Sequence, residues 1–281
     1  MTATYTVNCS ILYTDLPLLD RPAAARDAGF TAVEFWWPFE SAIPSDRQVS
    51  AFVTAVGDAG VQLSGLNFAA GDMPSGDRGI LSNPGSTLIF RDNVDIAVGI
   101  ADALGTTMFN ALYGNRIDGL PAQLQDDTAI ENLAFAASAA DRIGASVLVE
   151  PVSGAPRYPI TTAARAVDVI DRVGAPNLRL LADLYHLFVN GDDVNAAITT
   201  YSSYIGHIQI ADAPGRGEPG TGQIELGEHL GRLLAGGYHG YVGLEYKATR
   251  RDPFSWLPRA QRGADAIGPG SPQVPAKRGS L

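Results

Sequence analysis

The chain has 281 residues, of which 46% are hydrophobic and 18% are charged. It is therefore long enough for one large α/β barrel or two ordinary domains, and apolar enough to bury a substantial core. Its formal net charge is −10. An acidic surface repels the phosphate backbone of DNA and RNA, so the composition argues against a nucleic-acid partner.

The single cysteine, Cys9, excludes an intramolecular disulfide and a cysteine-based zinc site. Residues 1–8 have neither the basic nor the apolar region of a secretory signal. The most apolar long run, residues 178–189, is interrupted by Arg179, Asp183 and His186 and is too short to span a bilayer. We therefore expect a cytoplasmic protein with no membrane partner.

One unit recurs along the chain: a helix-like segment ends at a glycine, and a short apolar strand follows. A glycine in this position adopts the left-handed conformation that ends a helix. The expected helices are residues 18–28, 46–59, 87–104, 130–143, 162–173, 194–201 and 227–235. The expected strands are residues 5–9, 32–35, 61–67, 107–110, 146–150, 178–183, 204–209 and 241–245.

Strands that are apolar throughout and alternate with helices are typical of a parallel sheet buried on both faces. Eight such units predict a single closed (β/α)₈ TIM barrel. The alternative, an open doubly wound sheet, requires a strand–glycine-loop–helix motif near the start, which this sequence lacks. We assign the barrel to residues 1–250. Residues 251–281 form a Pro/Gly-rich C-terminal tail, expected to be largely flexible, although Phe254, Trp256 and Leu257 could pack on the barrel.

Three long loops, residues 68–86, 111–126 and 211–224, follow expected strands. In a barrel, such loops build the active face. The segment 215–220 matches G-x-G-x-x-G but contains Pro219 and precedes no helix start, so we interpret it as a substrate loop and expect no nucleotide cofactor. The aromatic segment 36–39 could roof the pocket, pack in the core or join a subunit interface in a homo-oligomer.

Four consecutive strands each end at an oxygen-donor side chain: Glu150, Asp183, Gln209 and Glu245. Any one of them could be a simple helix cap. In a closed barrel, however, the strand ends converge on the axis. Carboxylates crowded in this way repel one another and lose hydration, so they require a cation or shared protons. An all-oxygen ligand set favours Mg²⁺ or Mn²⁺ over zinc.

Several motifs resemble those of the hydroxypyruvate isomerase family, within the superfamily of xylose isomerase-like barrels. They are Leu148-Val-Glu-Pro151, Leu181-Ala-Asp-Leu-Tyr-His186, His207-Ile-Gln-Ile-Ala-Asp212, Arg216-x-Glu-Pro219 and Gly243-Leu-Glu-Tyr-Lys247. The resemblance extends from about Val7 to Lys247 and so covers nearly all of the chain before the tail. The motifs are specific in combination, whereas each alone is weak.

This resemblance implies that Glu150, Asp183, Gln209 and Glu245 bind one divalent metal ion. It also implies that Glu150 and Glu245 are the catalytic pair that transfers protons. Related ketose 3-epimerases carry His where Gln209 stands, so Gln indicates the hydroxypyruvate isomerase branch. The implied reaction converts hydroxypyruvate to tartronate semialdehyde through an enediolate, in which a metal stabilises the charge and a carboxylate moves the proton.

A small hydroxy-oxo acid also needs a partner for its own carboxylate. Arg216 is the first candidate because its planar fork matches a carboxylate, and Lys247 is the second. Glu218 is expected to hold Arg216 in place. His186 is expected to hydrogen-bond a substrate hydroxyl or orient a carboxylate. The residues that end the earlier strands are expected to line the pocket as hydrogen-bonding groups: Asn8, Glu34, Asn67 and Asn110.

Three alternatives stay open at this point. A 2-oxo-tetronate isomerase or a ketose 3-epimerase would use the same site with different room in the loops. A nuclease of the endonuclease IV type would use several histidine ligands and a basic face, whereas this chain has four histidines and a net charge of −10. A barrel that binds a sugar acid without turnover would have no need of the repelling pair Glu150 and Glu245.

Overall fold

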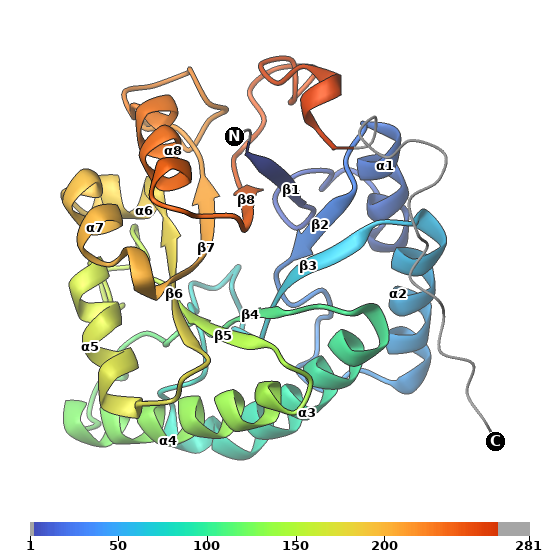
Figure 1. Cartoon of the computed structure of the whole chain (residues 1–281). Coiled ribbons are helices and arrows are strands. Elements are labelled where there is room, and N and C mark those ends of the chain that lie inside the picture. The colour runs from blue at the N-terminus through green and yellow to red at the C-terminus, as the bar shows by residue number, and fades with distance from the viewer. Residues whose placement is uncertain (1–2, 264–281) are drawn as a thin grey trace.

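Eight parallel strands form a closed barrel in a computed structural model that describes residues 3–263 (Figure 1). Each strand pairs with its neighbours in chain order, and the last strand pairs with the first. The strands are β1 (Thr4–Asn8), β2 (Ala32–Phe35), β3 (Gln62–Asn67), β4 (Met108–Asn110), β5 (Ser146–Val149), β6 (Leu178–Asp183), β7 (Ile205–Ile210) and β8 (Tyr241–Leu244). The predicted TIM barrel is confirmed.

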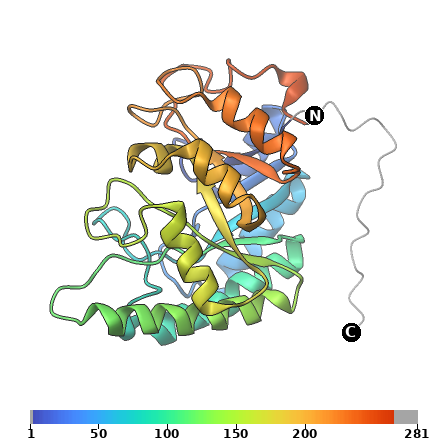
Figure 2. The same cartoon turned by 60° about the vertical axis from the view of Figure 1, so that its left-hand side comes forward.

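The α-helices surround the barrel, and α3 and α4 lie side by side on its outside (Figures 1 and 2). They are α1 (Arg21–Asp27), α2 (Asp46–Ala59), α3 (Thr87–Leu104), α4 (Ala122–Asp141), α5 (Ala163–Val173), α6 (Leu184–Val189), α7 (Val194–Thr200) and α8 (Leu226–Ala235). Helices, together with the segment after β8 that packs on Tyr5 of β1, cover the outside of the barrel, so the sheet is buried on both faces, as the apolar strand sequences predict.

Two helices differ from the sequence-based expectation. Helix α4 begins at Ala122 rather than at residue 130, because Pro121 precedes it with the fixed φ that suits a helix start. The predicted loop 111–126 is shortened accordingly. Helix α6 was not predicted at all, because its residues continue the apolar run of β6. The Asp183 side chain accepts hydrogen bonds from the first N–H groups of α6 and so begins this helix directly after the strand.

The segment after β8 packs back on the first units of the barrel, where it lies beside α1 in Figure 1. Phe254 and Leu257 are buried, and the rings of Phe254 and Phe30 lie 4.8 Å apart between centroids. Arg262 donates hydrogen bonds to the carbonyl oxygens of Ala28 and Phe254. This part of the expected C-terminal extension therefore contributes to the core. Its remainder, residues 264–281, lies outside the described residues.

No helix between residues 3 and 263 is both long and apolar enough to cross a membrane.

Removing the Phe254 ring is expected to destabilise the whole barrel. The side chain is 2% exposed, and truncating a buried phenylalanine costs about 3–5 kcal/mol. Urea unfolding followed by circular dichroism should show this loss for Phe254→Ala. Leu88→Ala is the control, because Leu88 is 77% exposed and its truncation should change the free energy of unfolding by less than about 0.5 kcal/mol. Equal effects of the two substitutions would show that the segment is not part of the cooperative fold.

Candidate active site

The four oxygen-donor residues converge at the carboxyl ends of β5 to β8. Asp183 is the last residue of β6, and Glu150 and Glu245 each follow directly after β5 and β8. Gln209 lies inside β7, which continues for one residue more than expected. All four side chains are buried. The geometry of the barrel therefore brings together residues that are far apart in the sequence.

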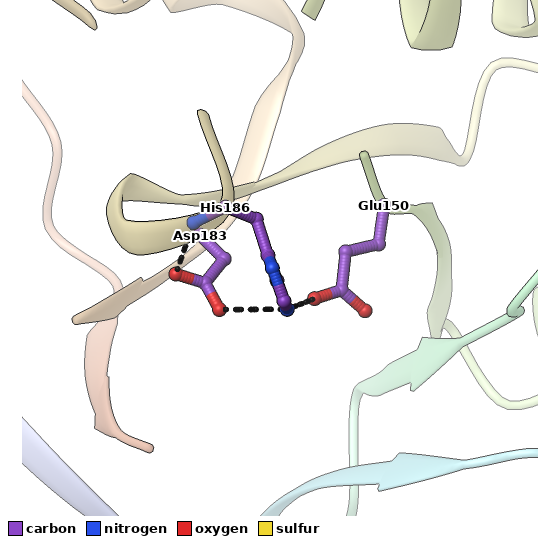
Figure 3. A group of neighbouring side chains, drawn as sticks. All are labelled: Glu150, Asp183 and His186. Atoms are coloured by element: carbon purple, nitrogen blue, oxygen red, sulfur yellow. Dashed lines mark hydrogen bonds and ion pairs between the residues drawn. The ribbon is translucent and has the colours of Figure 1, made fainter. Parts of the chain in front are cut away.

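His186 lies between two of these carboxylates (Figure 3). Its Nε2 is 3.9 Å from an oxygen of Glu150 and 3.6 Å from an oxygen of Asp183. The backbone N–H of Ser153 donates to Nδ1 at 3.0 Å. Nδ1 is therefore unprotonated, and a neutral ring carries its proton on Nε2. Burial lowers the pKa of His186 to about 4 against the opposing charge of Asp183, so the ring is neutral at pH 7.

This tautomer limits what His186 can do. Glu150, Asp183 and His186 are close enough to share a metal ion, but a protonated Nε2 has no lone pair to offer one. The same N–H can donate to an oxygen atom of a substrate. The structure thus favours the substrate-binding role expected for His186 over a role as metal ligand.

Asp183 divides its two oxygens between two tasks. Oδ1 accepts from the backbone N–H groups of Tyr185 at 2.8 Å and His186 at 3.3 Å, which begins helix α6. Oδ2 faces the site, 3.2 Å from Nη2 of Arg216. The carboxylate is therefore a helix cap and a site residue at once, with one oxygen for each.

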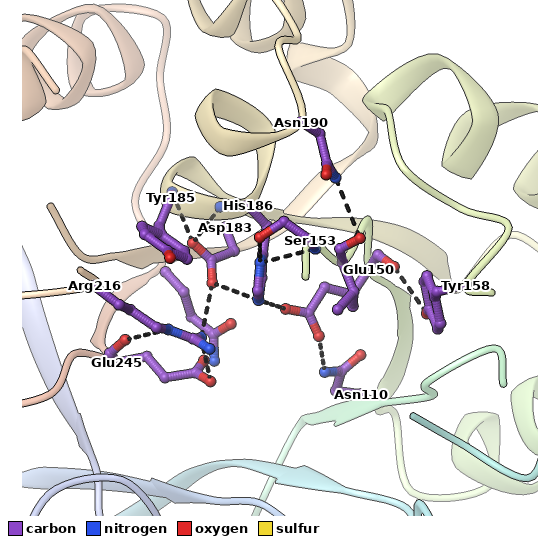
Figure 4. Close-up of polar contacts among 12 residues, drawn as sticks. Asn110, Glu150, Ser153, Tyr158, Asp183, Tyr185, His186, Asn190, Arg216 and Glu245 are labelled. Carbon is purple, nitrogen blue, oxygen red and sulfur yellow. Dashed lines mark hydrogen bonds and ion pairs between the residues drawn. The ribbon is translucent and has the colours of Figure 1, made fainter. Parts of the chain in front are cut away.

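Arg216 reaches the same carboxylates from the loop after β7 (Figure 4). Its Nη2 lies 2.8 Å from Oε1 of Glu245, its Nε donates to the Glu245 backbone oxygen at 3.2 Å, and its guanidinium lies 5.3 Å from the ring centroid of Tyr185. The backbone of Arg216 has a φ of 61°, a left-handed conformation that costs a residue with a side chain about 1–3 kcal/mol. The loop therefore holds Arg216 in a strained conformation that places its charge in the site.

Two acidic residues hold this loop in shape. The Asp212 carboxylate accepts hydrogen bonds from the backbone N–H groups of Ala213, Gly220, Gly222 and Ile224. The buried Glu218 carboxylate accepts from both the backbone and the hydroxyl of Thr249 and from the backbone of Arg250. Glu218 thus ties the loop to the segment after β8. None of its hydrogen bonds within residues 3–263 goes to Arg216, so any support for Arg216 is indirect.

The remaining expected substrate-binding residues differ in their placement. Asn110 donates to Oε2 of Glu150 at 2.6 Å, which places it directly in the site. Asn67 is buried at the end of β3. Lys247 is exposed, and its backbone N–H, not its ammonium group, contacts the loop by donating to the Arg216 carbonyl at 2.7 Å.

Sequence reasoning missed two contacts of the site. The indole N–H of Trp36 donates to Oε1 of Glu245 at 3.0 Å, which gives one residue of the aromatic segment a polar role at the pocket. Ser153 orients His186 through its backbone N–H and its hydroxyl. No sequence pattern indicates the role of Ser153, because its contact joins a loop to a helix 33 residues away.

Burial sets the protonation of the two candidate catalytic carboxyls. Burial and, to a lesser extent, the charge of Asp183 together raise the pKa of Glu150 to about 8, against the hydrogen bond from Asn110, which lowers it. Burial also raises the pKa of Glu245 well above its usual value, although Arg216 acts in the opposite direction. Without a further cation, both carboxyls therefore hold their protons more tightly than in water.

The donor set fits a hard divalent metal ion. Gln209 Nε2 donates to Glu34 at 2.7 Å, whereas Gln209 Oε1 is buried with no hydrogen-bond partner among the described residues. A buried carbonyl oxygen without a partner is costly. This oxygen and the carboxylates of Glu150, Asp183 and Glu245 form the all-oxygen set that Mg²⁺ and Mn²⁺ prefer.

Comparison with known proteins places this barrel in a family. The family model of the xylose isomerase-like TIM barrel matches residues 22–267. A candidate hydroxypyruvate isomerase of Streptomyces coelicolor is 53% identical, with 92% of this chain and 97% of the relative covered. The hydroxypyruvate isomerase of Escherichia coli is 34% identical over 90% of this chain and 97% of its own length. A 2-oxo-tetronate isomerase of Cupriavidus necator is also 34% identical, over 90% and 96%.

A solved structure agrees with these matches. The crystal structure of an AP endonuclease, family 2, from Brucella melitensis superposes with a TM-score of 0.83 at 31% identity, with 91% of this chain and 98% of that chain covered. Fold, site and comparisons together define an isomerase built on a xylose isomerase-like barrel. Within that class, the chain belongs to the hydroxypyruvate isomerase family.

The raised pKa of Glu150 predicts a pH-dependent stability of the metal-free protein. The unfolded carboxyl ionises near pH 4.3 and the folded one near pH 8, so between these values the folded state binds more protons. The free energy of unfolding should therefore fall as pH rises through this window, by up to about 1.4 kcal/mol per pH unit for one proton. Urea unfolding in chelator at several pH values measures this slope.

Glu150→Gln removes one of the two carboxyls whose pKa is raised and should make the slope shallower, while Glu245 still contributes to it. Glu228→Gln is the matched control, because Glu228 is exposed and pairs only with Arg232 in the described structure. A slope that Glu150→Gln leaves unchanged would contradict the assignment.

Proposed function

We propose that this protein is a divalent-metal-dependent isomerase of a small 2-oxo acid, and that it interconverts hydroxypyruvate and tartronate semialdehyde. The observation that carries the proposal is the buried pair Glu150 and Glu245, which lies beside a cationic Arg216 and an amide oxygen of Gln209 that no group in the described part of the chain pairs with. The hydroxypyruvate isomerase relatives, which match almost their full length, support the choice of substrate.

The proposed metal site consists of Glu150, Asp183, Gln209 and Glu245, with Mg²⁺ or Mn²⁺ as the ion. When bound, such an ion polarises the carbonyl group of the substrate and stabilises the negative charge that develops on its oxygens. Among the described residues, Oε1 of Gln209 has no hydrogen-bond partner, whereas its amide nitrogen donates to Glu34. Oδ1 of Asp183 begins helix α6 and Oδ2 accepts from Nη2 of Arg216 at 3.2 Å, so a bound ion would compete with Arg216 for Oδ2.

Glu150 and Glu245 are proposed to move the proton. The isomerisation breaks a C–H bond at the hydroxymethyl carbon and forms one at the former carbonyl carbon, while a proton moves from the first oxygen to the second. One of the two carboxylates removes the carbon-bound proton, and the other glutamate returns a proton to the adjacent carbon. Asn110 orients Glu150, and Trp36 and Arg216 orient Glu245, so both groups are held before the substrate arrives.

Arg216 and His186 are proposed to bind the substrate. The guanidinium of Arg216 can donate to the substrate carboxylate from Nη1, because its Nε and Nη2 already donate to Asp183 and Glu245. The Nε2–H of His186 can donate to a substrate oxygen. Glu218 and Asp212 support this arrangement through the loop. Asn67 is proposed as part of the pocket wall, whereas the exposed ammonium group of Lys247 is proposed as a second, weaker attraction for an acid.

A 2-oxo-tetronate is the second candidate substrate, because the isomerase of Cupriavidus necator named for that substrate is as similar to this chain as the enzyme of Escherichia coli. Proton NMR of the purified protein with Mg²⁺ or Mn²⁺ decides between them. Turnover of hydroxypyruvate supports the proposal, and turnover of 2-oxo-tetronates alone selects the second candidate. Turnover of ketoses alone, or full activity after complete removal of metal by a chelator, would overturn it.

Replacing either glutamate with glutamine should abolish most turnover while the metal ion stays bound. Glu150→Gln and Glu245→Gln keep the size and one oxygen but remove the acid–base group, so kcat should fall about 10²–10⁴-fold. Steady-state kinetics combined with elemental analysis measures both properties. Asp183→Asn and Gln209→Ala are the contrast: they should lose metal affinity first and regain activity at high metal concentration. Near-normal turnover of both glutamine variants would rule out the proposed proton transfer.

Arg216→Ala should discriminate between substrate classes. Loss of a desolvated partner costs a bound carboxylate about 2–5 kcal/mol, so KM should rise steeply for 2-oxo acids and much less for neutral ketoses. Arg216→Lys keeps the charge without the planar guanidinium, so its KM for 2-oxo acids should lie between those of the wild type and Arg216→Ala. Equal increases for acids and ketoses would indicate that Arg216 only orders the loop.

A further inference from the structure

A second polar cluster lies beneath the proposed metal site, inside the barrel. Its centre is Glu34 on β2, which is 3% exposed. The Glu34 carboxylate accepts hydrogen bonds from Gln209 Nε2 at 2.7 Å, His207 Nε2 at 2.7 Å and Asn8 Nδ2 at 3.2 Å. All three partners are buried. The Glu34 cluster, as we call these four residues, joins β2 to β7 although these strands are not neighbours in the sheet.

A glycine makes this contact across the barrel possible. A Cβ atom at Gly243 of β8 would lie 2.7 Å from Oε1 of Glu34 and 2.8 Å from Cγ of Gln209. These distances are shorter than van der Waals contact, so any side chain at position 243 would push Glu34 and Gln209 apart. The space between the two side chains therefore depends on Gly243.

The chemistry of Glu34 determines which way the Gln209 amide faces. A carboxylate accepts hydrogen bonds and cannot donate them, whereas a glutamine amide has one donor end and one acceptor end. The attraction to Glu34 holds the nitrogen end, and the oxygen end is left buried, with no hydrogen-bond partner between residues 3 and 263. In the reversed orientation, the amide oxygen would face a carboxylate and the NH₂ group would face the metal site, and both contacts are repulsive.

We infer that Glu34 is a positioning residue for the metal site: it orients the Gln209 amide so that its oxygen is available to a divalent cation. This inference rests on the metal site proposed above. His207 holds the other oxygen of Glu34 and so keeps the carboxylate in place. Groups that orient metal ligands in this way commonly contribute about 10–100-fold to metal affinity.

The binding of Mn²⁺ to the metal-free full chain, measured by titration calorimetry, tests the inference without reference to turnover. Glu34→Gln replaces the acceptor with an amide that can face Gln209 with either end, so the Kd for Mn²⁺ should rise about 10–100-fold. Ser64→Ala is the matched control. Ser64 is buried inside the same barrel and hydrogen-bonds Thr6 and the Val33 carbonyl, outside the Glu34 cluster, and its variant should bind Mn²⁺ as the wild type does.

Exchanging the two groups gives the sharpest comparison. In the double variant Glu34→Gln/Gln209→Glu, the donor and the acceptor trade places, so the hydrogen bond is remade and one oxygen at position 209 stays available. Its Kd should return toward the wild-type value, whereas Gln209→Glu alone places two carboxylates together and should not bind as well as the double variant. If Glu34→Gln does not fold, the comparison of the double variant with Gln209→Glu alone decides the question, and equal Kd values for these two would overturn the role of Glu34.

The outcomes separate the two proposals. A wild-type protein that binds no Mn²⁺ overturns the metal site itself. A wild type that binds Mn²⁺, together with a Kd unchanged in Glu34→Gln, overturns only the role of Glu34. A folded double variant that binds no better than Glu34→Gln, or a Ser64→Ala variant weakened to the same extent, also overturns that role, because the effect would then be a general loss of core structure.

Discussion

The repulsion among buried carboxylates at the mouth of the barrel is the constraint on which the rest of the site depends. Glu150, Asp183 and Glu245 are each almost completely removed from water, and an ionised carboxyl group in such surroundings is stable only with a partner. In the described structure that partner is Arg216, and amide and indole N–H groups donate further hydrogen bonds. The pKa values of Glu150 and Glu245 are also raised, which favours their uncharged forms. The site is therefore built to accept positive charge.

The shape of the loop after β7 follows from the need of these buried carboxylates for a cationic partner. A cation must reach the barrel axis from a surface loop, and Arg216 does so only in an unfavourable backbone conformation. Asp212 and Glu218 supply seven hydrogen bonds that hold the loop in that conformation. Asp212 and Glu218 thus stabilise the loop conformation that places the basic Arg216 in the site.

The sequence predicts the barrel and the convergence of four oxygen-donor residues well, because both depend on the spacing of apolar residues and on the order of strands and helices. Strands that alternate with glycine-ended helices specify the topology, and the topology alone brings Glu150, Asp183 and Glu245 together. Helix α6 escaped prediction because an apolar run does not distinguish a strand from a short buried helix. The contacts of Trp36 with Glu245 and of Ser153 with His186 could not be predicted, because each depends on how a loop lies over the site.

Glu34 is an instructive intermediate case. Its position near the end of a strand predicts that it lines the pocket, whereas in the structure it is buried inside the barrel and contacts the site through Gln209. Its partners on β7 lie on the far side of the axis, and no spacing in a linear sequence indicates which polar side chains meet across a barrel interior. Gly243 would have been equally hard to interpret, because its importance lies in the atoms that it leaves room for.

The closure of the barrel also has a consequence for how the chain folds. Trp36 and Glu245 are 209 residues apart, Glu34 and Gln209 are 175 apart, and Ala28 and Arg262 are 234 apart. Contacts between such distant residues form late, because a long loop must close first. The site therefore forms only after the last two strands have packed against the first two, both in refolding and during synthesis on the ribosome. A partly formed barrel should therefore be inactive. The recovery of turnover during refolding would measure the step in which the first and last strands pair.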